Sequence, residues 1–198
     1  MASPDTIQLW GGALSLDFAN SVDWSGADEP RGRKTDALGE PDDVVRWGRR
    51  LGVLTGDAPH GVTEDELAAC HALRAAVHAT FAALARGAEP PDAALDALAR
   101  AHAEAAAAGR LVRHADGWGW GWPSADVRQV RFAAAVDAVA LLGDPGRLAR
   151  VRRCPGRGCG WLFLDASGRR RWCSMQTCGS RAKMRRLYER RRSAGAAG

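Results

Sequence analysis

Two close pairs of cysteines stand in residues 154–178, which read CPGRGCGWLFLDASGRRRWCSMQTC. Four residues separate Cys154 from Cys159, four separate Cys173 from Cys178, and thirteen lie between the pairs. This spacing is typical of a structural zinc site, in which each pair forms a tight turn and four thiolates complete a tetrahedron. Two disulfides, unrelated buried cysteines or an iron–sulfur cluster are the alternatives. A catalytic zinc is disfavoured because it keeps one coordination position open for water.

The spacer between the two pairs predicts a β-hairpin. WLFLD is strand-like, ASG suits a turn, and RRRW can supply the return strand. Arginines around the cysteines favour thiolates over thiols and offset the charge of about −2 on a zinc ion with four thiolates. A metal also replaces the hydrophobic core that about forty residues cannot build. We therefore predict one structural Zn²⁺ held by the four cysteines.

Charge divides the chain into two unlike parts. Residues 146–198 hold 15 Lys and Arg against two acids, a net charge of +13, whereas residues 1–145 carry −8. We place a domain boundary at this change. The predicted domains are a regulatory helical domain at 1–146, a zinc module at 147–193 and a disordered tail at 194–198. A segment as basic as the second part predicts a polyanionic partner.

A basic helix is expected after the last cysteine. Ser180 suits a helix cap, and the helix would run for about three turns. Met184, Leu187 and Tyr188 share one arc, which we expect to pack on the zinc site. Basic residues flank the opposite face around Ala182, and a nucleic-acid groove could approach there. The candidate DNA-binding residues are Arg181, Lys183, Arg185, Arg186 and Arg190. The alternative is a solvated helix, on which opposite charges are usually mixed.

The first 146 residues predict a mostly helical domain. Helices are expected at residues 14–24, 41–54, 63–86 and 92–108, and from Ser124 to about Leu142. Residues 109–123 alternate in polarity around an Asp-Gly turn, which predicts a β-hairpin. Its three tryptophans either line a pocket or, as we favour, cover the core. The fold class is therefore mainly α: a helical domain with a short β-hairpin, then a small treble-cleft or ribbon-like zinc module of a β-hairpin and a helix.

Five residues are candidates for a ligand site. Asp17, Asn20 and Asp23 fall on one side of the first helix, and Arg46 and Trp47 could complete a site with them. The interpretation we favour is that such residues cap and bridge neighbouring elements.

The segment CGWLFLDASGRRRWCSMQTCGSRAKMRRLYERRR resembles the CGNR-type zinc finger of bacterial stress-induced transcription regulators. LSLDFANSVDW is similar to the start of the ABATE domain that usually precedes this finger. The resemblance implies that Cys154, Cys159, Cys173 and Cys178 bind zinc, that the finger binds DNA and that the ABATE domain is a sensor or regulatory unit. The naming motif reads CGSR here, with Ser180 in the place of Asn; serine also caps helices, so zinc binding should persist.

The sequence therefore predicts a zinc-dependent DNA-binding regulator with an N-terminal sensor or dimerisation domain. A zinc-stapled RNA-binding protein or protein-interaction adaptor is the alternative. An enzyme is disfavoured because the chain shows no nucleophile–base motif, no Gly-rich phosphate loop and no open metal site. The expected partners are duplex DNA, a small-molecule effector and a second copy. The start of the chain does not read as a signal peptide and no long uncharged apolar stretch occurs, so we expect a cytoplasmic protein without a membrane span.

Overall fold

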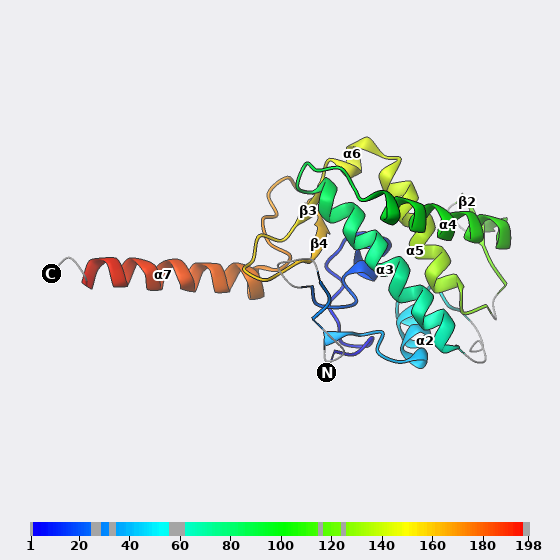
Figure 1. Ribbon diagram of the computed structural model, residues 1–198, viewed down its shortest axis with the longest axis horizontal. Coiled ribbons are helices and arrows are strands. Elements are labelled where there is room, and N and C mark those ends of the chain that lie inside the picture. The colour runs from blue at the N-terminus through cyan, green and yellow to red at the C-terminus, as the bar shows by residue number, and fades with distance from the viewer. Residues whose placement is uncertain are drawn as a thin grey trace.

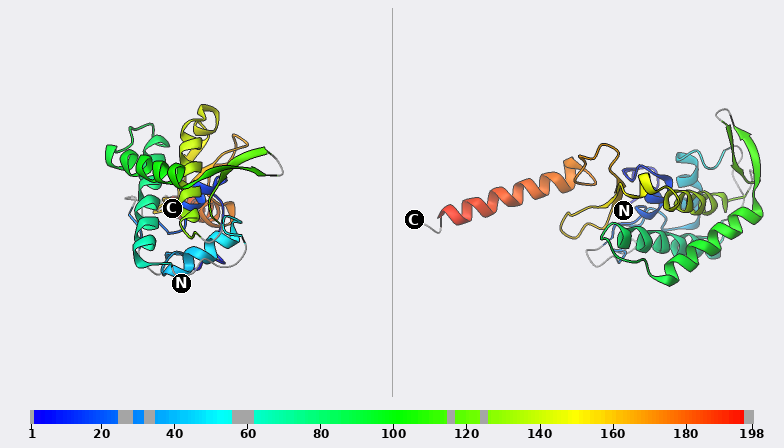
Figure 2. Two further views of the ribbon diagram at one scale, coloured as in Figure 1. Left: turned by 90° about the vertical axis from the view of Figure 1, so that its right-hand side faces the viewer. Right: turned by 90° about the horizontal axis from the view of Figure 1, so that it is seen from above.

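The computed structural model describes residues 2–24, 29–31, 35–55, 62–114, 117–123 and 126–195. A helical body holds most of the chain, and one long helix, α7, extends away from it (Figure 1). The view from above shows the same projection and places a β-hairpin near the opposite end of the body (Figure 2, right). The mainly helical fold class is confirmed.

The body is built around helix α3, Glu64–Leu84. Its predicted start is confirmed, because Thr63 Oγ1 accepts a hydrogen bond from the Glu66 backbone N–H at 3.2 Å. The helix is long and apolar enough to cross a membrane, but 61% of its most apolar window is buried inside the fold, as in a core helix. The other body helices are α1 (Leu14–Ala19), α2 (Pro41–Arg50), α4 (Asp92–Ala108), α5 (Gln129–Leu142) and α6 (Pro145–Leu148). α4 packs on α3 and α5, and α1 lies against α3 and α5.

Strands β1 (Arg110–His114) and β2 (Gly117–Gly121) form the predicted antiparallel hairpin. The expectation that its tryptophans cover the core is wrong for Trp118 and Trp120, which are 73% and 39% exposed. Trp122 explains the difference. It follows β2, packs its ring against Phe132 and donates from Nε1 to the Ala105 carbonyl at 2.8 Å. The strands beyond this anchor leave the body (Figure 2).

The C-terminal part contains β3 (Val151–Arg153), β4 (Leu162–Leu164), the π-turn η2 (Met175–Gly179) and α7 (Ser180–Gly195). WLFLD supplies β4 as expected, but its partner is β3 and not RRRW. Val151 and Leu162 explain this pairing, because both are buried in the main core of the body. One sheet therefore belongs to both the zinc module and the helical domain.

Several helix limits differ from the expectations. α2, expected at residues 41–54, ends at Arg50. α1 ends at Ala19, and Val22 and Trp24 then form isolated β-bridges to the loop that precedes α2. The predicted cap Ser124 lies outside the described residues, and α5 begins at Gln129. α7 continues to Gly195, and the last three residues of the predicted tail also lie outside the described residues.

Candidate metal centre and basic helix

The four predicted cysteines meet in one cluster. Their Sγ atoms all lie within 4.8 Å of one another. Cys173 Sγ lies 3.8 Å from Cys159 Sγ and 3.7 Å from Cys178 Sγ. A tetrahedral zinc ion with Zn–S bonds of about 2.3 Å requires S···S distances of about 3.8 Å. The donor set and its geometry thus fit one structural Zn²⁺ site, and all four ligands are protein thiolates.

Backbone hydrogen bonds position these sulfurs. Cys154 follows β3, and its N–H donates to the Trp161 carbonyl at 2.8 Å, which holds the first turn closed. Within that turn the Cys159 N–H donates to the Gly156 carbonyl at 2.8 Å. A Cβ atom on Gly156 would lie only 2.8 Å from Cys178 Sγ, so the two turns approach as closely as a glycine permits.

Repulsion between neighbouring thiolates disfavours ionisation of the crowded cysteines unless a cation joins them. The Cys159 and Cys173 thiols donate hydrogen bonds to Cys154, which lowers the pKa of Cys154 well below its usual value. The same contacts raise the pKa of Cys159 and Cys173, because the negative charge is already placed on Cys154. A divalent cation removes this conflict by binding four thiolates together.

Two arginines hold the backbone around the cluster. Arg170 donates to the carbonyls of Trp10 (2.7 Å) and Cys173 (2.6 Å), and its guanidinium lies 4.3 Å from the centre of the Phe163 ring. Arg31 reaches across from the helical domain and donates to the Gly158 carbonyl at 2.5 Å. These arginines therefore fix the metal-binding turns as well as adding positive charge near the thiolates.

Three residues of the first domain fasten the zinc module to the body. Asn20 Nδ2 donates to the Leu162 carbonyl at 2.8 Å, and the Leu162 N–H donates to Asn20 Oδ1 at 3.0 Å. Asp23 Oδ1 accepts from Trp161 Nε1 at 3.0 Å. His78 Nε2 lies 2.8 Å from the Gly160 carbonyl, and its ring stacks on that of Trp24. We call Asn20, Asp23 and His78 the interdomain clamp.

The five candidates for a ligand site are not brought together. Asn20 and Asp23 belong to the clamp. Asp17 Oδ1 accepts from the Gly11 N–H at 2.7 Å, and burial raises its pKa to about 6. Arg46 pairs with Asp5 and Asp43 at the surface, and Trp47 is fully buried against the Phe18 ring. The bridging interpretation fits these contacts, so an effector site stays a prediction without residues assigned to it.

Helix α7 faces the body with a different side from the one expected. Ala182 is only 3% exposed, whereas Met184 is 63% and Tyr188 64% exposed. The expectation that the apolar arc packs on the zinc site, with a groove approaching Ala182, is therefore wrong. Ala182 lines the hollow beside the first cysteine turn together with Gly156 and Cys178, so this side of α7 is the one that faces the metal site. α7 extends away from the body beyond its first turns (Figure 1), and Met184 and Tyr188 of the apolar arc are exposed.

The predicted cap at Ser180 is also wrong. The helical winding already begins at Met175, in the π-turn η2 that carries Cys178. Ser180 Oγ donates to the Met175 carbonyl at 3.0 Å, and Ser174 is the cap, since its Oγ accepts from the Gln176 N–H at 3.2 Å. At the start of this helix the Ser180 side chain therefore acts as a hydrogen-bond donor to the Met175 carbonyl, and not as the helix cap.

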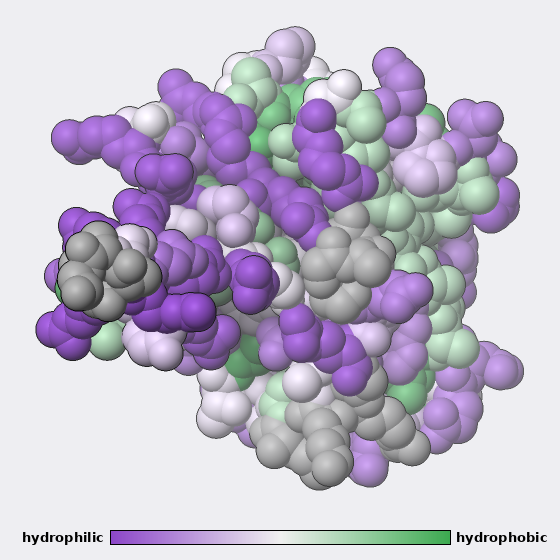
Figure 3. Space-filling model, turned by 60° about the vertical axis from the view of Figure 1, so that its left-hand side comes forward, coloured by the Kyte–Doolittle hydropathy of each residue, from purple (hydrophilic) through white to green (hydrophobic). Residues whose placement is uncertain are grey.

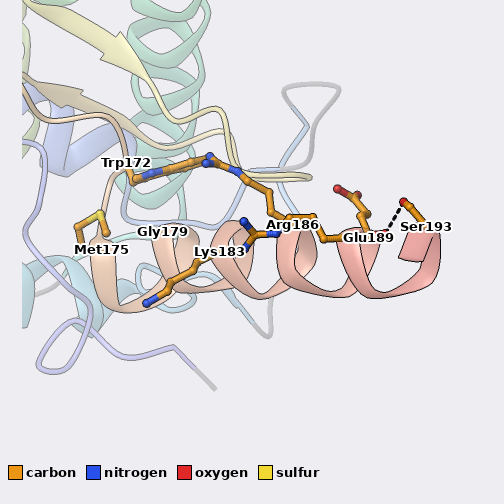
Figure 4. Close-up of a pocket in the computed structure, with 8 residues that line it drawn as sticks. Trp172, Met175, Gly179, Lys183, Arg186, Glu189 and Ser193 are labelled. Atoms are coloured by element: carbon orange, nitrogen blue, oxygen red, sulfur yellow. Dashed lines mark hydrogen bonds between the residues drawn. The ribbon is translucent and has the colours of Figure 1, made fainter. Parts of the chain in front are cut away.

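All five candidate DNA-binding residues are exposed along α7. The space-filling view shows hydrophilic side chains gathered over this helix (Figure 3). A hollow of about 490 Å³ runs along one side of it, from Trp172 and Met175 past Lys183 and Arg186 (Figure 4). Arg185 lies 4.0 Å from Glu189, the one acid on the helix.

Arg157 is a basic residue that the sequence did not single out for this surface. It lines a second hollow of about 210 Å³ together with Arg181 and Arg185. The sequence signal is an arginine between two glycines inside the first cysteine turn, PGRG. In the structure this arginine is exposed. The basic surface thus begins on the metal site and continues along α7.

Comparison with protein families gives two matches. Residues 12–145 match the ABATE family, described as "Putative stress-induced transcription regulator", and residues 150–191 match the CGNR zinc finger. No curated protein matches the chain.

Proposed function

We propose that this chain, which belongs to the ABATE family and carries a CGNR zinc finger at residues 150–191, binds duplex DNA through helix α7. Zinc would be held by the four clustered cysteines and would supply structure, not catalysis, because every coordination position has a protein thiolate. The expected role is therefore non-enzymatic. The expected compartment is the cytoplasm.

One observation carries the proposal: a basic helix projects from the body with its charges accessible. Arg181, Lys183 and Arg186 are exposed on a helix that leaves the body after its first turns (Figure 1). Duplex DNA carries one phosphate charge per about 1.7 Å of its axis, so a projecting basic helix meets a dense row of partners. A helix standing free of the body can also enter a groove without collision.

The interdomain clamp supports a regulatory role for the first domain. Asn20 and Asp23 follow directly from α1, and they hold Leu162 and Trp161 of the zinc module. A change in the packing of the first domain, caused by an effector or by a second copy, would be transmitted to the metal-binding turns through these contacts. A module this small contacts few base pairs, which favours a homodimer on DNA.

RNA is the second candidate partner, favoured by one observation. The Tyr188 ring is 64% exposed on the basic helix. Exposed aromatic rings among arginines can stack on unpaired bases. The test of the proposed function therefore compares duplex DNA with single-stranded RNA at matched salt.

The first prediction concerns the double variant Arg185→Ala/Arg186→Ala. Each phosphate contact contributes about −0.9 to the slope of log K against log salt, so the variant should flatten the slope for duplex DNA by up to about two units. Fluorescence anisotropy across a salt series measures this slope, and zinc content should be unchanged because neither residue is a ligand.

The matched control is Arg110→Ala/Arg113→Ala, which removes the same charge from the exposed hairpin near the opposite end of the body. It should leave the slope as it is. If the α7 variant binds duplex DNA with the affinity and slope of the parent chain, α7 is not the DNA-binding surface. Tighter binding to single-stranded RNA would move the second candidate ahead.

A further inference from the structure

The exposed apolar arc of α7 lies opposite the side that touches the body. At about 100° per residue, Met184, Leu187 and Tyr188 fall at about 140–240° around the axis from Ala182. Ala182 is buried and marks the inward side, whereas Met184 and Tyr188 are well exposed. The arc therefore points away from the cysteine turns, towards whatever approaches α7 from outside.

Basic residues border this arc on both sides. Measured from Ala182, one flank lies at about 40–100° and the other at about 260–300°. The first flank contains Lys183, Arg186 and Arg190, and the second contains Arg181, Arg185 and Arg192. Arg191 falls at about 180°, in the centre of the apolar arc. The outward side of α7 is thus apolar around one arginine, with positive charge along both borders.

A second copy of α7 fits this surface poorly. Pairing two such arcs would bring four basic flanks together, and the described part of α7 offers only Glu189 to compensate. A bilayer surface also fits poorly, because the arc has three apolar side chains with Arg191 among them. The charge pattern is complementary to a groove that has anionic borders and an uncharged floor.

The major groove of duplex DNA has this form. It is about 12 Å wide and admits a helix, its borders are the two phosphate backbones, and its floor shows base edges. The apolar group on that floor is the thymine C5 methyl, and the groups that arginine binds best there are guanine O6 and N7.

We propose that Met184, Leu187 and Tyr188 form the base-reading face of α7 and contact thymine methyl groups, while Arg191 binds a guanine between them. This inference rests on the proposed function, namely that α7 binds duplex DNA. It assigns the two basic flanks to the phosphates of opposite strands and the apolar arc to sequence recognition.

The experiment uses the zinc-loaded full chain and duplexes that it selects from a random pool. Each selected duplex is then remade with deoxyuridine for thymine, which removes the C5 methyl and keeps the base pairing. Burial of one methyl changes an affinity by about fourfold, so the parent chain should bind each remade duplex at least about fourfold more weakly. The triple variant Met184→Ala/Leu187→Ala/Tyr188→Ala should bind both duplexes equally.

Two controls separate this inference from the proposed function. Arg185→Ala/Arg186→Ala should flatten the salt slope by up to about two units but keep the preference for thymine over deoxyuridine, because it alters only the flanks. Arg191→Ala should reduce the preference for guanine by about fivefold or more at one position. Alanine favours helix, and these positions are exposed apart from the half-buried Leu187, so circular dichroism and zinc content should match the parent.

Several outcomes would overturn the inference. One is a selection that yields no sequence preference. Another is a parent chain that binds thymine and deoxyuridine duplexes with equal affinity. In both cases the chain would still bind duplex DNA with the same salt slope. Loss of binding to anionic vesicles in the triple variant, with DNA binding unchanged, would assign the arc to a lipid surface. If the chain does not bind duplex DNA in any arm, the proposed function itself fails.

Discussion

Replacement of Asn20 by alanine tests the link between the two domains. Asn20 is 1% exposed; the NH2 of its side-chain amide donates to the Leu162 carbonyl, and the amide oxygen accepts from the Leu162 N–H. Asn20→Ala leaves the Leu162 N–H and carbonyl buried without these partners. Each such group costs about 1–3 kcal/mol, so the free energy of unfolding should fall by about 2–6 kcal/mol.

The assay is urea unfolding of the zinc-loaded chain, followed by far-UV circular dichroism and by zinc release to a coloured chelator. Because Leu162 belongs both to the main core and to the sheet that leads into the metal site, both signals should move to lower urea. Gln176→Ala is the control: it removes an exposed amide close to the cysteines and should leave both midpoints unchanged. A loss below about 1 kcal/mol in Asn20→Ala, with zinc release unaltered, would refute the assigned role of the clamp.

Two further predictions concern the metal and the pH response. Cys173→Ser should reduce the zinc content, measured by mass spectrometry, from about one ion per chain to a small fraction, because it removes a ligand. Most of the helical circular dichroism signal should remain. The control Cys70→Ala alters a buried cysteine outside the cluster and should keep the metal. Burial raises the pKa of Asp17 from 3.8 to about 6, so the folded chain binds this proton more tightly and the stability contributed by Asp17 falls as pH rises from about 4 through 6. Asp17→Asn should lose that part of the pH dependence of the urea midpoint, and an unchanged profile would contradict the assignment.

The metal site could be predicted from the sequence because its information is local. Two short cysteine turns with glycines allow few arrangements, and a tetrahedral metal selects one of them. The partner of β4 could not be found this way. RRRW and the segment of Val151 were both available, and the choice was made by burial of Val151 in a core formed mostly by distant helices.

The orientation of α7 shows where helical periodicity fails. Periodicity correctly places Met184, Leu187 and Tyr188 on one arc, but it does not show whether a partner covers that arc. The prediction assumed that large apolar side chains face the body. Instead the small Ala182 lies beside the cysteine turns and is buried, while the larger Met184 and Tyr188 side chains are exposed.

Because of the shared sheet, the zinc finger is not expected to fold as an independent module when it is moved to another protein. β3 and β4 contribute Val151 and Leu162 to the core of the first domain, and the Asn20 side chain donates a hydrogen bond to the Leu162 carbonyl of β4. A chimaera that grafts residues 147–193 onto another protein would expose those apolar side chains and discard the clamp. Exchange between relatives should therefore take α1 and the turn after it along with the finger, and the two segments are expected to vary together in evolution.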